Sequence, residues 1–376
     1  MTYETLNECQ KRAVNQLCTF LAKPEEKHMV LTGSGGTGKG YLLRYLYKHW
    51  DYIENKVSIF NNTVKVPKPE FTATTNEAVY QLQIPLASTI YSFATIRPSG
   101  SSLIAYRAPT MHTGLVFIDE ASYIDEKTFK LIERQLPNYK IVWVMDQYQL
   151  APVGSELPYA HTQAFRTVEL RTIERCKGML QKLVQELREA VKNQEGVNFR
   201  AYHCDDIQIV DTHTFHQMIV ERFREDPINS KVVMFKNKSV DRYNKAINEH
   251  ALGNPPFPFV GANAIVNSYN EIYNHRVGTR LVIDRIHKTG LDTEVALETS
   301  IGSLLTPVDK TNLRDHPHYI DIALPYASTT HKAQGSTIDT VFVDAKDIFS
   351  TWDAEMRRRL IYVAISRASK KVVICL

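Results

Sequence analysis

The sequence lacks the features that mark secreted, disulfide-rich or membrane proteins. Its five cysteines are scattered, with no CxxC pair and no metal-ligand spacing, which predicts reduced thiols in a cytosolic protein. The N-terminus does not resemble a signal peptide, and no apolar run approaches the ~20 residues that a membrane-spanning helix needs. Internal repeats and low-complexity tracts are also absent. We therefore expect a soluble, intracellular protein with no membrane partner.

The composition is that of an ordinary globular protein. With 376 residues, the chain is long enough for two cored domains, or for one domain with insertions. Hydrophobic residues make up 43% and charged residues 23%, and the formal net charge is +4. This charge permits a polyanionic partner but does not require one.

A glycine-rich stretch, GSGGTGKG, follows the apolar run 29–31. It matches the phosphate-binding pattern GxxxxGK[ST] except at the last position, where Gly40 replaces the hydroxyl residue that binds Mg²⁺. Glycines let several backbone N–H groups point at one phosphate, and Lys39 adds a mobile positive charge. The alternative is a glycine-rich turn with no ligand. The loop residues expected to bind nucleotide are Gly33, Ser34, Gly35, Gly36, Thr37, Gly38, Lys39 and Gly40.

The segment ahead of this loop has the pattern of a helix. Apolar residues recur at helical spacing up to Leu21, Asn7 is a suitable N-cap, and Pro24 ends the segment. Gln10 lies on this helix, and its amide has the donor and acceptor that fit the N6/N7 edge of an adenine. The alternative for a single Gln is an ordinary surface residue.

Two short apolar runs end in polar residues that suit phosphoryl chemistry. The run 115–118 ends at Asp119 and Glu120, and a pair of carboxylates is costly to bury without a use. Asp119 would hold Mg²⁺ and Glu120 would polarise the attacking water, whereas the alternative is an N-cap for the next helix. The run 141–145 ends at Asp146, and Gln149 nearby could sense the γ-phosphate.

Further polar clusters favour nucleic-acid contacts. The run 71–76 has the pattern of a strand ending at Thr75 and Asn76, although its hydroxyls could equally cap a helix over 77–82. In the cluster 88–92, Ser92 could contact a phosphate and an exposed Tyr91 could stack on a base. Three strands with polar ends predict an open α/β sheet with its site at the carboxyl ends of the strands.

In order along the chain, Gln10, GSGGTGK, TATTN, STIYS, DEAS and DQYQLAPV resemble the motifs of superfamily 1B helicases. The set is most similar to the Dda-type and RecD-like DNA helicases of phages and bacteria. That resemblance implies two tandem RecA-like P-loop domains with parallel sheets, and ATP with Mg²⁺ in the cleft between them. This chain departs from the usual motifs at Gly40, at Met145 where Gly is usual, and at Tyr91 where His is usual.

Matching motifs occur in the second half of the chain. The stretch IER resembles the fourth motif, which implies that Arg175 contacts the γ-phosphate from the second core, and YVAISR resembles the sixth, which implies the same contact for Arg367. The stretch THKAQGST resembles the fifth motif, in which Gln334 and Gly335 turn toward ATP. Taken alone, each arginine could be a surface residue, and the stretch 236–241 could be a solvated turn. The implied nucleic-acid contacts here are Asn237, Lys238, Thr330, His331, Lys332 and Ser336.

The resemblance also suggests how the domains divide. Residues 1–175 would form the first RecA-like domain, with an inserted hairpin at about 93–114. Residues 176–376 would form the second, with a small β-subdomain at about 260–320 that is SH3-like in this family. An amphipathic helix over 179–193, ended by Gly196, would be scaffold.

Together these features predict an ATP-dependent DNA helicase or single-stranded DNA translocase, of 5′→3′ polarity by resemblance. We expect a monomer that acts on single-stranded DNA and DNA junctions, with replication or recombination proteins as partners, in the host cytoplasm if it is encoded by a phage. The alternative is a nucleic-acid-binding clamp with weak or no ATP turnover, because Gly40 replaces the Mg²⁺-binding hydroxyl. The arginines and THKAQGST disfavour a P-loop kinase or GTPase.

Overall fold

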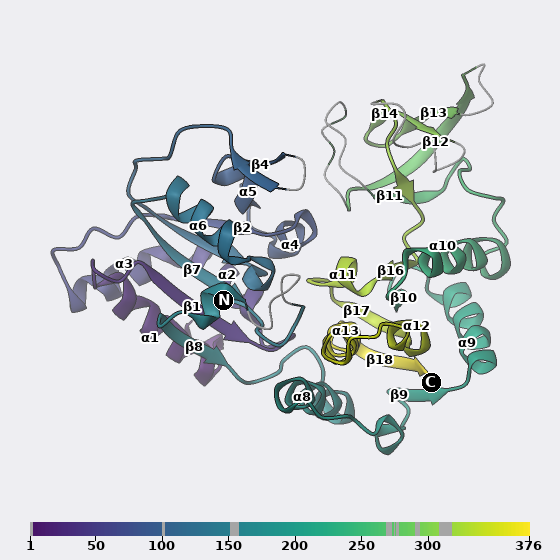
Figure 1. The fold of residues 1–376 in the computed structure, drawn as a ribbon, viewed down its shortest axis with the longest axis horizontal. Coiled ribbons are helices and arrows are strands. Elements are labelled where there is room, and N and C mark those ends of the chain that lie inside the picture. The colour runs from purple at the N-terminus through teal and green to yellow at the C-terminus, as the bar shows by residue number, and fades with distance from the viewer. Residues whose placement is uncertain are drawn as a thin grey trace. The chain divides into compact units, whose positions relative to one another are not determined.

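The computed structural model describes residues 3–99, 102–150, 158–267, 273, 275, 278–289, 294–307 and 318–376 (Figure 1). The chain forms two compact units. Unit 1 consists of Met1–Asn198, Gln334–Thr337 and Asp353–Ser369, and unit 2 of Phe199–Ala333, Ile338–Trp352 and Lys370–Leu376. The domain boundary expected after residue 175 stays a prediction, because this division by contacts follows different limits.

Unit 1 is built on a parallel sheet with the strand order β3-β2-β6-β7-β1-β8. Its strands are β1 (His28–Gly33), β2 (Pro69–Ala73), β3 (Ser88–Thr89), β6 (Gly114–Asp119), β7 (Tyr139–Met145) and β8 (Arg166–Leu170). Its helices are α1 (Glu8–Leu21), α2 (Lys39–Lys48), α3 (Trp50–Phe60), α4 (Asn76–Leu82), α5 (Ile90–Phe93), α6 (Glu126–Gln135), α7 (Tyr159–Thr162), α8 (Gly178–Asn193) and α13 (Ala354–Ile365). The predicted α/β class with a parallel sheet is confirmed.

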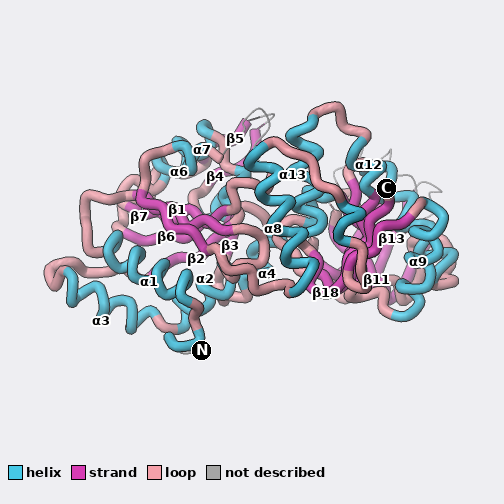
Figure 2. The backbone as a smooth tube through the Cα atoms, turned by 90° about the horizontal axis from the view of Figure 1, so that it is seen from below, coloured by secondary structure: helices cyan, strands magenta, loops and turns pink. Residues whose placement is uncertain are grey.

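Both faces of this sheet are covered, which explains why its strands are continuously apolar. Successive side chains of a strand point to opposite faces. Met29 and Val142 therefore join the core under α1 to α4, whereas Val30 and Trp143 join the core under α5, α6 and α7. Figure 2 shows α6 on one side of β1, β6 and β7, and α1, α2 and α3 on the other.

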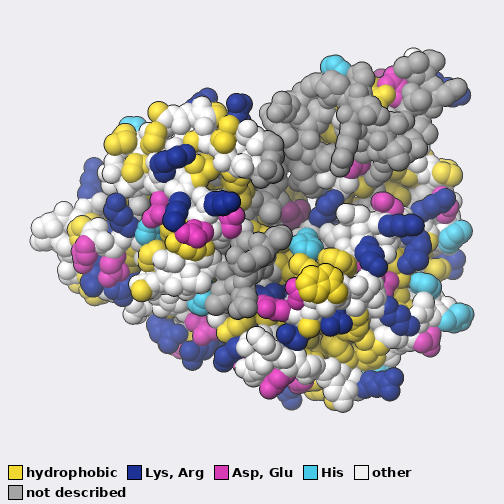
Figure 3. Space-filling model, in the orientation of Figure 1, with side chains coloured by type: hydrophobic (Ala, Val, Ile, Leu, Met, Phe, Trp, Pro, Cys, Tyr) yellow, Lys and Arg dark blue, Asp and Glu magenta, His cyan; other side chains and the backbone are white. Residues whose placement is uncertain are grey.

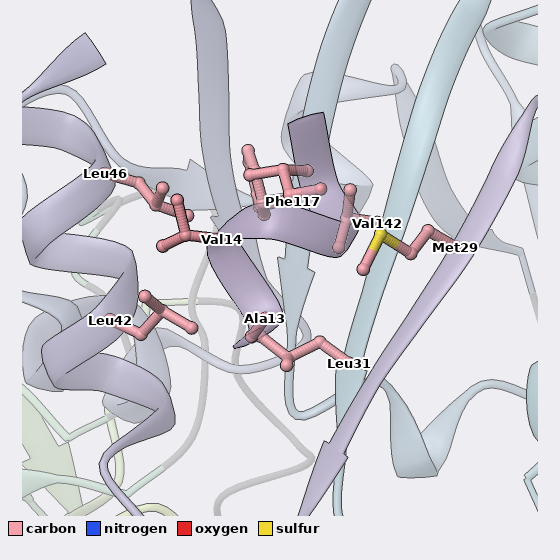
Figure 4. A pocket seen from close by; sticks show the side chains of 9 residues that line it. Ala13, Val14, Met29, Leu31, Leu42, Leu46, Phe117 and Val142 are labelled. Atoms are coloured by element: carbon pink, nitrogen blue, oxygen red, sulfur yellow. The ribbon is translucent and has the colours of Figure 1, made fainter. Parts of the chain in front are cut away.

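A small apolar cavity lies between α1, α2 and the sheet, next to the predicted phosphate loop (Figure 4). Because its walls carry almost no polar groups, it is suited neither to a nucleotide nor to an ordered water. It is part of the packing that fixes α2 on the sheet. Its lining residues are Ala13, Val14, Leu17, Met29, Leu31, Leu42, Leu46, Phe117 and Val142.

Two local predictions in unit 1 can be compared directly with the structure. The expected inserted hairpin is present as β4 (Ile96–Ser99) and β5 (Ser102–Ala105), which pair antiparallel. The predicted amphipathic helix is α8, but Gly196 does not end it. Gln194 is the C-cap instead and adopts the left-handed conformation, with φ 62°.

Unit 2 contains a second sheet, with the strand order β16-β10-β17-β18-β9 and parallel pairing of β16, β10 and β17 and of β18 with β9. These strands are β9 (Ile207–Val210), β10 (Ser230–Met234), β16 (Ala327–Thr329), β17 (Ile338–Asp344) and β18 (Ala368–Cys375). The helices of this unit are α9 (Thr212–Glu225), α10 (Asn237–Ala246), α11 (Thr330–Ala333) and α12 (Ala345–Phe349). Their shared core includes Phe215, Phe223 and Phe342.

A smaller sheet of unit 2 pairs in the order β14-β13-β12-β11-β15, with antiparallel neighbours and its own apolar core (Figure 1). Its strands are β11 (Asn263–Val266), β12 (Arg280–Lys288), β13 (Glu294–Thr299), β14 (Gly302–Pro307) and β15 (Ile322–Ala323). The expected β-subdomain is thus present, while its SH3-like character stays a prediction. Among the described residues, no helix has the length and apolar character needed to cross a membrane.

Candidate nucleotide site and nucleic-acid contacts

The glycine-rich loop joins β1 to α2 at the carboxyl edge of the sheet, as a phosphate loop should. Gly36 and Gly38 have positive φ angles of 86° and 81°, which glycine adopts without strain. They are also closely approached. A Cβ at Gly36 would lie 2.6 Å from the Cβ of Arg175, and one at Gly38 would lie 2.5 Å from Nε2 of Gln10. The glycines are therefore required by conformation and by packing.

Lys39 starts α2 and folds back over the loop. Its Nζ donates to the carbonyl oxygens of Gly33, at 2.7 Å, and Ser34, at 3.1 Å. Burial lowers the pKa of Lys39, while the nearby carboxylates of Asp146, Glu120 and Asp119 oppose that shift. A cation held by neutral carbonyls and surrounded by carboxylates is well placed to exchange those carbonyls for a phosphate.

Gln10 is buried beside the loop. Asn7 and Gln10 form a capping box, in which the Gln10 N–H donates to Asn7 Oδ1 at 2.9 Å and the Asn7 N–H donates to Gln10 Oε1 at 3.1 Å. The predicted N-cap is therefore confirmed. The adenine contact of Gln10 stays a prediction. Its NH₂ group lies next to Gly38, but its oxygen already accepts one hydrogen bond.

The paired carboxylates stand at the end of β6. Burial, followed by the negative charge of Glu120, raises the pKa of Asp119 to about 7. Glu120 adopts the left-handed conformation, with φ 52°, which is unusual for a residue with a side chain. Its carbonyl accepts from Thr74 Oγ1 at 3.0 Å, and its N–H donates to Asp119 Oδ1 at 2.9 Å. These bonds hold the two carboxylates in a defined orientation.

These residues fit a magnesium ion. Burial and the charge of Glu120 outweigh the opposing charges of Lys39 and Arg44 and raise the pKa of Asp119, so a bound cation would stabilise its carboxylate. Within the described chain, no group of three or more His, Cys, Asp or Glu side chains could hold a metal alone. Mg²⁺ suits such a site, because it is usually bound by one or two carboxylates together with phosphate oxygens and several waters.

The end of β7 carries a buried network around Asp146, which is 1% exposed. The carboxylate accepts from the hydroxyl of Tyr362 at 2.6 Å and from Nε2 of Gln149 at 3.0 Å. The same Tyr362 hydroxyl accepts from the backbone N–H of Gly35 at 3.2 Å. Gln149 is thus fixed beside the loop, and its buried Oε1 has no hydrogen-bond partner among the described residues.

Two arginines pack against the same loop. The N–H groups of Glu174 and Arg175 both donate to the Gly36 carbonyl, at 2.7 and 3.1 Å. Arg367 is 1% exposed, and its Nη2 would be 3.0 Å from a Cβ at Gly35. Burial and the neighbouring charge of Arg367 lower the pKa of Arg175 to about 9. Two adjacent cations that lack an ion pair with the described residues favour a bound anion.

The compact unit to which the arginines belong differs from what the resemblance implies. The resemblance implies a contact from the second core for both arginines, although the expected division after residue 175 assigns Arg175 to the first domain. In the structure, Arg175 and Arg367 both belong to unit 1, as does the loop. The reason is physical: the chain after β8 runs directly past Gly36, and the Nη1 of Arg175 donates to the carbonyl of Ser366 at 2.6 Å. Their contacts with the γ-phosphate stay predictions.

Gln334 contacts the carboxylate of Glu120. Its Nε2 donates to Glu120 Oε2 at 3.0 Å, and its Oε1 accepts from the hydroxyl of Tyr123. Gly335 follows with φ 84°, and a Cβ there would lie 3.7 Å from Glu120 Oε1. The segment Gln334–Thr337 therefore belongs to the site through Glu120, and its predicted contact with ATP stays a prediction.

In unit 1, the predicted nucleic-acid residues lie in short helices or cap them. Thr75 accepts from the Ala78 N–H and is the N-cap of α4, as the alternative interpretation held, yet it remains exposed. Asn76 begins α4, and Ser92 is exposed on α5. The expectation of an exposed Tyr91 is wrong, because its ring is half-buried against the core of that sheet face.

In unit 2, polar residues follow β10 and β16. Asn237 and Lys238 are exposed at the start of α10, so the stretch that could have been a solvated turn is helical from Asn237. Asp347 holds this start, since its carboxylate accepts from the N–H groups of Phe235 and Lys236, each at 2.8 Å. Lys and Arg side chains gather over α10 in the space-filling view (Figure 3). They include the exposed Lys236, Lys238, Arg242 and Lys245.

The residues predicted on α11 divide into two groups. His331 and Lys332 are exposed, so both can meet a ligand from solvent. Thr330 is fully buried, and its hydroxyl donates to the Met234 carbonyl at 3.1 Å, so this side chain serves the core. Ser336 is half-buried and belongs to unit 1. Contacts of all these residues with nucleic acid stay predictions.

Two tyrosines of the site were not predicted from the sequence. Tyr362 lies inside the motif YVAISR, and its place beside an assigned arginine is the signal that could have identified it. Tyr123 lies three positions after Glu120 in DEASY, and nothing in its local sequence indicates a bond to Gln334, 211 positions away.

Comparisons with known proteins agree with this geometry. The chain matches the family described as AAA domain over residues 5–212, and the UvrD-like helicase C-terminal domain over residues 324–375. The ATP-dependent DNA helicase dda of Enterobacteria phage T4 is 23% identical over 98% of this chain and 98% of its own length.

Solved structures with the same fold include two Pif1 helicases. Pif1 from Candida albicans has a TM-score of 0.56 at 19% identity, covering 98% of this chain and 94% of that one. Pif1 from Bacteroides, in complex with ADP-AlF3 and single-stranded DNA, has a TM-score of 0.57 at 14% identity, covering 98% and 92%. Since the AAA-domain match spans more than half of the sequence and the phage helicase aligns along nearly all of it, this chain belongs to the superfamily 1B DNA helicases.

Proposed function

We propose that this helicase hydrolyses ATP with Mg²⁺ at the Gly33–Gly40 loop and moves 5′→3′ along single-stranded DNA. The observation that carries the proposal is the convergence in unit 1 of Lys39, Glu120 and two arginines around one glycine-rich loop. Charges of these types surround a triphosphate in phosphoryl-transfer enzymes. Arg367 is buried without an ion pair to any described residue, an arrangement that is costly unless an anion binds beside it.

Each group has a distinct part in the proposed reaction. Backbone N–H groups of the loop and Lys39 hold the β- and γ-phosphates. Arg175 and Arg367 offset the negative charge that develops on the γ-phosphate as its bond breaks. The amide of Gln149, oriented by Asp146, reports whether the γ-phosphate is present.

Glu120 orients and deprotonates the attacking water. Its carboxylate stands on a backbone fixed by Thr74, and Gln334 occupies one of its two oxygens, which leaves the other oxygen for water. Asp119 would hold Mg²⁺, which neutralises phosphate charge when bound. The lack of a hydroxyl at Gly40 would weaken Mg²⁺ binding without abolishing it, because Mg²⁺ usually keeps several waters.

Each unit by itself offers polar or basic groups that would contact a DNA strand. These groups are exposed, except that Asn76 is half-buried. They are Thr75, Asn76 and Ser92 in unit 1 and Lys238, His331 and Lys332 in unit 2. The 5′→3′ polarity rests on the resemblance to Dda-type helicases. We further propose a monomer that acts on single strands and junctions during DNA replication, recombination or repair, together with proteins of those processes.

The second candidate is a nucleic-acid-binding clamp with little turnover, and Gly40 is the observation that favours it. The presence of a well-oriented Glu120 argues against it, because a clamp has no need of a water-activating carboxylate. Both candidates bind nucleotide and DNA, so binding alone does not distinguish them.

Hydrolysis and strand separation distinguish the candidates. Purified protein with Mg²⁺ and ATP should show hydrolysis stimulated by single-stranded DNA, and should separate a fork with a 5′ tail but not one with only a 3′ tail. Lys39→Ala should abolish hydrolysis, whereas Lys127→Ala, at an exposed position on α6, should not. Absence of stimulated hydrolysis refutes the motor and leaves the clamp, and separation that needs a 3′ tail refutes the polarity.

A further inference from the structure

Tyr123 contacts residues of the proposed hydrolytic site, but the reaction proposed above gives it no role. It lies in the short 3₁₀ turn Ala121–Tyr123, directly after Glu120. Its hydroxyl donates to Oε1 of Gln334, and Nε2 of Gln334 donates to Glu120 Oε2 at 3.0 Å. The three side chains thus form a chain of hydrogen bonds that ends on the carboxylate, and all three belong to unit 1.

The direction of this chain matters because an amide has two different ends. If the Gln334 amide were rotated by 180°, its oxygen would face the carboxylate of Glu120 and repel it. A donor on the far side favours the orientation in which the NH₂ group faces Glu120. Tyr123 supplies that donor, since burial and then the charge of Glu120 raise the pKa of its hydroxyl, which keeps its proton.

The backbone alone does not fix the carboxylate. The carbonyl of Glu120 is held by Thr74, and φ of 52° sets the direction in which the side chain leaves the chain. The side chain still has rotatable bonds beyond Cα. Among the described residues, Gln334 is the one side chain whose hydrogen bond holds the carboxylate oxygens of Glu120. Its orientation therefore decides where the free oxygen points.

We propose that Tyr123 is a positioning residue for Glu120. By donating to Gln334 it fixes the amide that holds one carboxylate oxygen, so that the other oxygen faces the attacking water. This inference rests on the proposed ATP hydrolysis, and it assigns Tyr123 no contact with nucleotide or DNA.

The test combines Tyr123→Phe with a second substitution, Gln334→Leu. Tyr123→Phe removes only the hydroxyl, and it should lower kcat for DNA-stimulated hydrolysis about 5- to 10-fold, as expected for loss of one positioning hydrogen bond. The KM for ATP and the affinity for a fluorescent ADP analogue should stay unchanged. In the Gln334→Leu background, adding Tyr123→Phe should have no further effect, because the link is already broken.

Tyr139→Phe is the matched control. Tyr139 lies in the same unit, and its hydroxyl has no hydrogen bond to any described residue, so this variant should keep the wild-type kcat. Three results would overturn the positioning role. Tyr123→Phe could keep the wild-type kcat, it could lower kcat equally with Gln334 and with Leu at that position, or it could weaken ADP binding in parallel with kcat. If the wild-type protein shows no DNA-stimulated hydrolysis, the proposed function fails together with the positioning role. If the wild-type protein hydrolyses ATP and only the predicted effects of the substitutions are missing, the positioning role alone fails.

Discussion

The substitution Gly40→Thr tests the most unusual feature of the nucleotide site. It restores the hydroxyl that the phosphate-loop pattern places on Mg²⁺. The structure has room for it, because a Cβ at Gly40 would meet one atom within 4 Å among the described residues, Arg44 Nη1 at 3.7 Å, which is ordinary contact. Gly40 has no positive φ, so a side chain causes no backbone strain there.

The magnitude follows from what the hydroxyl replaces. An ordered water costs up to about 2 kcal/mol of immobilisation entropy, and a hydroxyl already attached to the helix avoids much of it. Taking about 1 kcal/mol as the gain, the Mg²⁺ concentration for half-maximal hydrolysis should fall about fivefold. The same change should stabilise α2 by about 0.3 kcal/mol, because Gly is a poorer helix residue than Thr.

Gly40→Ala separates these two effects. It adds the Cβ and improves the helix by about 1 kcal/mol, but it supplies no metal ligand. Hydrolysis stimulated by single-stranded DNA is measured against free Mg²⁺, at saturating ATP, for all three proteins. If Thr and Ala shift the Mg²⁺ dependence equally, or if neither shifts it, the site already has another ligand and the reasoning fails.

Three further predictions concern the two arginines of the site, an ion pair and the apolar cavity. Arg175→Ala and Arg367→Ala should each lower hydrolysis by ~10³-fold or more while DNA affinity is kept, with the exposed Arg134→Ala as control, and normal turnover would show that the arginine was assigned wrongly. Glu26 pairs with Arg166 through two bonds of 2.7 Å, which lower the pKa of Glu26 to about 2. The pair stabilises the fold fully above about pH 4.5 and less as the pH falls toward 2, so Glu26→Gln should cost about 1–2 kcal/mol near pH 7 and almost nothing near pH 2 in denaturant titrations. Leu42→Ala should lower the free energy of unfolding by about 2–5 kcal/mol by enlarging the cavity beside α2, and a loss below 1 kcal/mol would mean that the helix collapses into the space.

The parts that sequence reasoning predicted well are those that local patterns determine. The run Met29–Leu31 had to be a buried strand because each of its side chains is apolar, and the structure covers both of its faces. The amphipathic stripe of α8 was equally clear. Asp119 was correctly placed at the end of an apolar strand, whereas the roles of Asp119 and Glu120 stay predictions.

The parts that it missed depend on contacts between distant residues. Whether Tyr91 is exposed depends on the packing of a whole sheet face. The hydrogen bond of Arg175 to Ser366, 191 positions away, has no local signal either. The residue that terminates α8 was misassigned for a different reason, although the predicted last helical residue, Asn193, is correct. Gly196 is the residue that sequence statistics favour, but Gln194 accepts the left-handed conformation where the helix stops. Hydrogen bonds of Tyr123 and Tyr362 to remote partners leave no periodic signal at all.

The bond between Tyr362 and the Gly35 amide has a kinetic consequence. The loop's own groups are engaged within the protein, since Gly35 donates to Tyr362 and Lys39 donates to the carbonyls of Gly33 and Ser34. If ATP binds this loop as proposed, its binding would be an exchange of partners, in which each internal bond opens before a phosphate oxygen replaces it. The association rate would then level off at high nucleotide concentration, at the rate at which the loop itself opens.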